Sequence, residues 1–137
     1  MREMINGYPS QNWISPYAVA TMNSEDVNVS NDATAKTNFK FDKLIYLPQD
    51  KDFCFVIRSN SNKYNVWTSQ MGEKSKETGN TVFEQPYAGT MFKSENNFTW
   101  TAEQNQDIKF TLYKAEFNVN KVADLKFHMS ANPTLIS

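Results

Sequence analysis

The segment Gln85–Phe117, QPYAGTMFKSENNFTWTAEQNQDIKFTLYKAEF, decides the fold class of this chain. It contains two strand-like runs, Thr90–Lys93 and Ile108–Phe117, which a polar loop joins. Apolar and polar residues alternate from Ile108 to Leu112, which is typical of a strand with one buried face. The alternation then shifts by one residue, and we expect a β-bulge there to keep both apolar sets on the core side.

Outward from this segment, further short runs have the composition of strands, and turn residues separate them. The runs are Tyr17–Met22, Asp26–Ser30, Thr37–Phe41, Leu44–Leu47, Phe53–Ile57, Tyr64–Ser69 and Thr81–Glu84. Short strands at intervals of about ten residues are typical of sandwiches and barrels. We therefore predict an all-β fold, an antiparallel β-sandwich of jelly-roll type with little or no helix. The one helical candidate is a single turn at Ala102–Gln106.

The most apolar run is Phe53–Ile57, which is too short for a typical helix and rich in residues that favour strands. We expect it to be a central strand in a hairpin with Tyr64–Ser69. The alternation predicts a mostly buried core of Phe39, Phe41, Phe53, Phe55, Ile57, Val66, Ile108, Phe110 and Leu112. The charged segment Gly72–Asn80 is bounded by turn residues, and we expect an exposed loop.

Three regions follow from these patterns. Residues 1–15 are polar and read as an N-terminal arm or linker, residues 16–117 as the β-sandwich domain, and residues 118–137 as a C-terminal extension. Both ends nevertheless contain apolar side chains that a solvated tail would not need. We expect these side chains to make assembly contacts with other chains, foremost Trp13, Ile14, Leu125 and Phe127.

Composition limits the function further. The 137 residues fit one domain, 39% of them are hydrophobic and 14% aromatic, and the net charge is −1. A nearly neutral chain with scattered charges argues against nucleic-acid binding, which needs a basic patch. No apolar run approaches the roughly 20 residues of a membrane helix. We expect no membrane partner, and the single cysteine is compatible with folding in a reducing cytoplasm.

No catalytic or metal site is predicted, and no cofactor. Cys54 lies between two phenylalanines, which favours a buried core thiol over a nucleophile. His128 is the only histidine, and no acid–hydroxyl pattern accompanies it. Asp50 and Asp52 flank a lysine in a turn, but the spacing of a calcium loop is absent.

Four aromatic residues are the candidates for ligand or partner binding: Tyr64, Trp67, Tyr87 and Trp100. Rings on the face of a β-sandwich can stack on sugars or receive a partner's side chain. Large aromatic residues are more often part of a core, and Trp100 has the place of a plug at the end of a sandwich. Joint exposure of the four rings would favour binding.

Residues 38–117 resemble a domain of large virion proteins of T-even-type contractile-tailed phages. The resemblance lies in FCFVIRSNSNKYNVWTSQMGE (53–73), QPYAGTMFKS (85–94) and TWTAEQNQDIKFTLYKAEF (99–117). It implies a non-catalytic structural domain of a baseplate, tail fibre or neck appendage, folded in the host cytoplasm and then held in the virion. The implied partners are other virion proteins, with self-association. The alternative is a carbohydrate-binding module for a cell-surface glycan.

Overall fold

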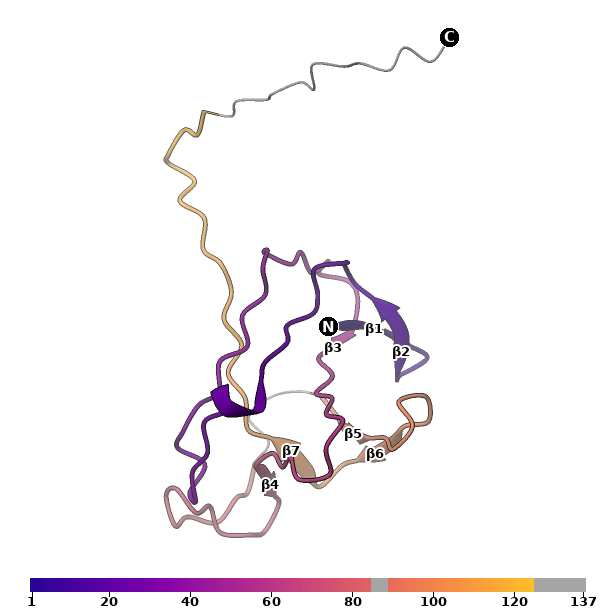
Figure 1. Cartoon of the computed structure of the whole chain (residues 1–137), viewed down its shortest axis with the longest axis vertical. Coiled ribbons are helices and arrows are strands. Elements are labelled where there is room, and N and C mark those ends of the chain that lie inside the picture. Colours follow the sequence, from indigo (N-terminus) through magenta and orange to yellow (C-terminus); the bar gives the residue numbers. More distant parts are fainter. Residues whose placement is uncertain (85–88, 125–137) are drawn as a thin grey trace.

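The computed structural model describes residues 1–84 and 89–124, in which short strands are joined by long irregular segments (Figure 1). They form three small sheets with the orders β2-β1-β3, β4-β7 and β5-β6, and every pair is antiparallel. A single turn of 3-10 helix is the helical exception. The elements are β1 (Arg2–Ile5), β2 (Tyr8–Trp13), η1 (Ser24–Asp26), β3 (Phe53–Cys54), β4 (Thr68–Gln70), β5 (Met91–Lys93), β6 (Thr101–Glu103) and β7 (Gln106–Ile108). The predicted all-β class is confirmed, while the packing of two sheets as a sandwich stays a prediction.

The first sheet begins with a tight hairpin at Asn6-Gly7. Both residues have positive φ, 52° and 79°, and Ile5 pairs with Tyr8 across the turn. A two-residue Asn-Gly turn of this kind matches the twist of antiparallel strands and favours a hairpin. Pro9 lies in β2, at the edge of the sheet, where a missing N–H costs least.

The interpretation of residues 1–15 as an arm outside the domain is wrong in one respect, because β1 is the central strand of a sheet. Arg2 pairs with Cys54 and Glu3 with Phe53, and the Met4 amide donates to the Asp52 carbonyl at 3.1 Å. The polar composition of β1 and β2 concealed these strands, since neither has a clear apolar face. The β1–β2 hairpin is therefore part of the folded domain.

The β5–β6 hairpin contacts this sheet through its loop and one ring. Asn97, which has a positive φ of 63°, accepts a hydrogen bond from the Arg2 guanidinium at 3.0 Å through its side-chain oxygen. The Gln11 side chain donates to the Asn97 carbonyl. Tyr8 and Phe92 meet with ring centroids 5.7 Å apart. Hydrogen bonds and one aromatic pair thus hold two of the three sheets together.

The third sheet corrects several predictions around the segment that decides the fold class. β7 covers Gln106–Ile108, and the run from Lys109 to Phe117 that was predicted as a strand forms none, so it contains no bulge in a ladder. The predicted helical turn at Ala102–Gln106 is occupied by the end of β6 and the start of β7. Alternation showed where a strand could form, but pairing needs a partner at the same register.

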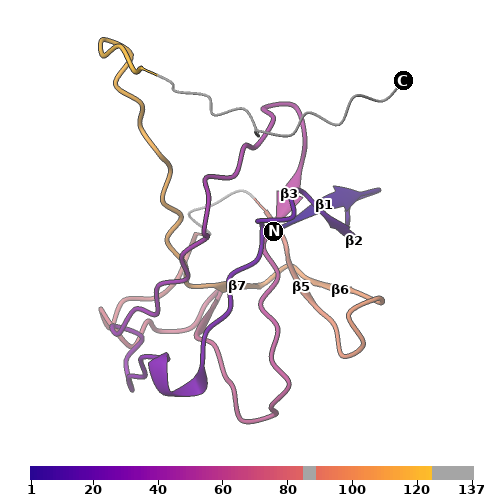
Figure 2. The same ribbon diagram turned by 45° about the horizontal axis from the view of Figure 1, so that its top comes forward.

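The predicted hairpin of Phe53–Ile57 with Tyr64–Ser69 is also wrong. Only Phe53–Cys54 is a strand, and it pairs with β1, whereas β4 pairs with β7 through Thr68 and Ile108. The predicted strands between Tyr17 and Leu47 are absent from the described residues, which run there as irregular chain interrupted by η1 (Figures 1 and 2). Both views also show the chain after β7 leaving the strands as an extended segment.

The predicted core is largely wrong. None of its nine members is buried: Phe41, Phe53, Ile108 and Phe110 are half-buried, and the other five are exposed. The buried apolar residues of the described part are Pro9, Ala18 and Met91, the last two with 1% and 7% exposure. Phe55 and Phe110 do meet, at 4.9 Å between ring centroids. The described chain therefore buries few of its apolar side chains against itself.

Candidate functional site

Three of the four aromatic candidates lie within the described residues, with different degrees of burial. Tyr64 and Trp100 are half-buried, Trp67 is 38% exposed, and Tyr87 lies outside the described residues. Trp67 precedes β4 and has the ammonium of Lys76 4.9 Å from its ring centre, a cation–π contact. Trp100 precedes β6, and its indole nitrogen is buried without a hydrogen-bond partner within the described structure. Partial burial of Trp100 agrees with packing more than with ligand binding.

Two of the four assembly candidates can be placed, and both lie at the end of β2. The Trp13 ring is exposed, and Trp13 pairs with Arg2 in the ladder. Ile14 is half-buried, and its amide donates to the Met1 carbonyl at 3.5 Å. Leu125 and Phe127 lie outside the described residues. Trp13 therefore offers an exposed ring on an element that is itself anchored in a sheet.

Large apolar side chains are exposed in two segments of the described chain, and one of them, Leu112, was predicted to be core. Leu44 and Tyr46 are 70% and 83% exposed, in the irregular chain before β3. After β7 more large side chains face solvent. We call the whole group the exposed apolar set: Leu44, Tyr46, Leu112, Tyr113, Phe117, Val119 and Val122. Where exposed apolar side chains adjoin one another in a large patch, they usually mark a surface that a partner covers.

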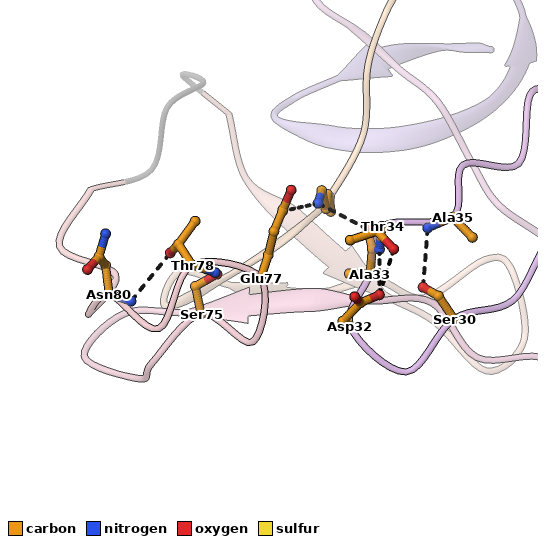
Figure 3. A network of polar contacts seen from close by, with 10 residues as sticks. Ser30, Asp32, Ala33, Thr34, Ala35, Ser75, Glu77, Thr78 and Asn80 are labelled. Atoms are coloured by element: carbon orange, nitrogen blue, oxygen red, sulfur yellow. Dashed lines mark hydrogen bonds and ion pairs between the residues drawn. The ribbon is translucent and has the colours of Figure 1, made fainter.

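A polar network connects three segments that are distant in the sequence (Figure 3). The Lys109 ammonium donates to the Ala33 carbonyl at 3.0 Å and forms an ion pair with Glu77. The predicted exposed loop Gly72–Asn80 is confirmed as exposed, apart from the half-buried Ser75. Lys109 attaches this loop to the turn that contains Asp32 and Thr34, so the loop is exposed and is also anchored through the Glu77 side chain.

The turn itself is stabilised by its own side chains. The Asp32 carboxylate accepts hydrogen bonds from the Thr34 hydroxyl at 2.7 Å and from the Thr34 amide at 3.1 Å. These bonds favour the ionised carboxylate and lower the pKa of Asp32. The Ala35 amide donates to the Ser30 hydroxyl at 3.3 Å. This is the ordinary chemistry of an Asx turn, and it positions Ala33 for Lys109.

Cys54 carries the only thiol of the chain, in β3. The side chain is half-buried, and burial raises the pKa of the thiol. Its Sγ lies 3.8 Å from the Arg2 carbonyl, to which the thiol can donate. A protonated, partly buried thiol is a poor nucleophile at neutral pH. Within the described residues, no group of three or more histidine, cysteine or acidic side chains is placed to hold a metal.

No protein-family model, curated protein or solved structure matches this sequence. In the described part, no helix has the length and apolar character needed to span a membrane. The function is therefore inferred from the sequence resemblance and from the surfaces described above.

Sequence reasoning missed two features of these surfaces. The first is the Asn6-Gly7 turn, whose dipeptide is a strong hairpin signal and could have identified β1 and β2. The second is the pairing of Arg2 with Asn97, for which the sequence holds no signal because 95 positions separate the two residues.

Proposed function

We propose that this chain is a non-catalytic structural domain of a phage virion, in the baseplate, fibre or neck region, that acts in assembly through contacts with other subunits. Among the apolar residues of the described part only Pro9, Ala18 and Met91 are buried, while the exposed apolar set faces solvent. This observation carries the proposal.

The physical reason lies in the balance of folding. Ordering a residue costs about 1–2 kcal/mol of backbone entropy, and burial of apolar surface supplies most of the compensation. Within the described residues the burial is small, so a partner that covers Leu44, Tyr46 and Leu112 would contribute stabilisation that the chain does not supply itself. A subunit that becomes fully stable only in an assembly is suited to a virion.

Strand edges offer the second means of contact. β4, β5, β6 and β7 lie in two-stranded sheets, and each has one edge without a partner strand in the described structure. Unpaired edges accept a strand from another chain through backbone hydrogen bonds. The resemblance of residues 38–117 to virion proteins supports other virion subunits, including further copies of this chain, as the partners.

The exposed apolar set gives a direct test. We expect the full chain to self-associate, and the double variant Leu44→Lys/Tyr46→Lys to shift toward monomer, because two charges would be buried in the contact. Light scattering coupled to size-exclusion chromatography measures the mass. The matched control is Ser59→Lys/Asn60→Lys, which adds the same charge at exposed polar positions.

Two results would count against the proposal. A chain that is monomeric at all concentrations and also fails to bind particles of the phage that encodes it would contradict an assembly role. Equal masses for the double variant and its control would remove Leu44 and Tyr46 from the contact. Mass spectrometry of purified particles tests the virion location separately.

A further inference from the structure

A shallow pocket lies where the β4–β7 sheet ends, and its lining includes none of Tyr64, Trp67 and Trp100. It has a volume of about 420 Å³ and is lined by Met71, Phe83, Glu84, Gln104 and Asn105. This volume falls within the range of roughly 300–1,000 Å³ that small-molecule sites occupy. Phe83 is 77% exposed, so most of its surface is accessible to a ligand.

Backbone hydrogen bonds hold the lining residues beside one another. The Met71 amide donates to the Asn105 carbonyl at 3.0 Å, which continues the β4–β7 ladder by one step. The Gly72 amide donates to the Val82 carbonyl at 2.9 Å, and the Val82 amide donates to Glu73 at 2.9 Å. These bonds place Phe83 next to the end of the β4–β7 sheet. The pocket is therefore framed by main chain.

The lining combines one aromatic ring with three hydrogen-bonding side chains. Asn105 and Gln104 carry amides, which both donate and accept, and Glu84 carries a carboxylate, which accepts strongly. A pyranose sugar has the complementary form, with C–H groups on one face and hydroxyls around the rim. The face of an aromatic ring is negative and attracts C–H groups. A purely apolar ligand could not donate a hydrogen bond to the Glu84 carboxylate.

We infer that this pocket binds a neutral pyranose unit of a glycan, which stacks on Phe83 and forms hydrogen bonds with Glu84 and Asn105. This activity goes beyond the assembly role and does not depend on it. It also moves glycan binding from the aromatic residues that the sequence suggested to Phe83, a residue in none of the predicted sites.

The test is an NMR titration of the ¹⁵N-labelled full chain with glucose, galactose, mannose and N-acetylglucosamine, each to millimolar concentration. We expect saturable shifts of the Met71, Phe83 and Asn105 amides with at least one sugar. Phe83→Ala should weaken that binding about tenfold, the upper range for loss of one aromatic contact. The matched control is Phe98→Ala, because Phe98 is 73% exposed and lies in the β5–β6 loop, outside the pocket.

Glu84→Gln is a second variant that keeps the shape of the side chain and should also weaken binding. The inference is overturned if none of the four sugars shifts the pocket amides, or if Phe83→Ala and Phe98→Ala bind equally. It is also overturned if N-acetylarginine amide, and no sugar, shifts them. In that case Phe83 and Glu84 would form a receptor for a cationic side chain.

Discussion

The guanidinium of Arg2 is almost fully removed from water, with 4% of the residue exposed. Its acceptors are neutral: the side-chain oxygen of Asn97 at 3.0 Å and the carbonyl of Ser10 at 3.4 Å. A buried charge with only neutral partners is costly unless its hydrogen bonds are well placed. Arg2 therefore contributes mainly as a cross-link between the first sheet and the β5–β6 loop.

Arg2→Ala should lower the free energy of unfolding by about 1–3 kcal/mol, because Asn97 and Ser10 lose their donor and the aliphatic stem loses its packing. The alanine variant no longer buries a charge, which offsets part of this loss of stability. It does not restore the contact between the first sheet and the β5–β6 loop. Urea denaturation measures the change. Arg58→Ala is the control, since Arg58 is exposed. Equal urea midpoints for Arg2→Ala and Arg58→Ala would show that Arg2 does not stabilise the contact between the first sheet and the β5–β6 loop.

Cys54 gives a prediction about pH. Because burial raises the pKa of the thiol above its ordinary 9.0, the folded chain keeps the proton where the unfolded chain releases it. Stability should therefore fall as the pH rises above 9.0, up to the raised pKa. Urea denaturation across this range should show a smaller decrease for Cys54→Ala. An identical pH dependence would contradict the burial of the thiol.

At the scale of elements, the apolar pattern identified the fold class but not the pairing of strands. Met91–Lys93 is a strand as predicted, while Leu112 and Tyr113, in an equally alternating run, are exposed and unpaired. The pattern reports which residues could share a face. It does not report whether a partner strand exists within the chain. The run after Ile108 has the composition of a strand that another chain could pair with.

Gly7 tests the first hairpin. Its φ of 79° is unfavourable for residues with a Cβ, and no atom lies within 4 Å of where that Cβ would be. Gly7→Ala should cost about 1–2 kcal/mol of unfolding free energy through the backbone alone. Asn6→Gly is the comparison and should be neutral or stabilising, because Asn6 also has positive φ. Thermal unfolding of both variants measures the change in stability. A melting temperature for Gly7→Ala equal to that of the unaltered chain would exclude the two-residue turn.

At the scale of the whole molecule, separate small sheets are connected by a few side chains. Asn97 and Tyr8 connect the first sheet to the β5–β6 hairpin, and the Lys93 ammonium donates to Gln106 of β7 at 3.0 Å. None of these contacts was visible in the sequence, because each joins residues from different elements by polar or aromatic side chains. Apolar periodicity predicts which residues could share a core, but it carries no information about polar and aromatic contacts of this kind.

Deletion of residues 1–15 tests how far these connections hold the molecule together. The deletion removes the partner strand of Phe53–Cys54 and, with Arg2, Tyr8 and Gln11, the contacts of the β5–β6 hairpin. We expect the truncated chain to lose cooperative thermal unfolding, measured by calorimetry. A chain in which residues 1–15 are scrambled keeps the length and composition and should behave like the deletion. If the truncated chain melts cooperatively at the original temperature, residues 1–15 form an arm after all, and Trp13 would then serve only contacts with other subunits.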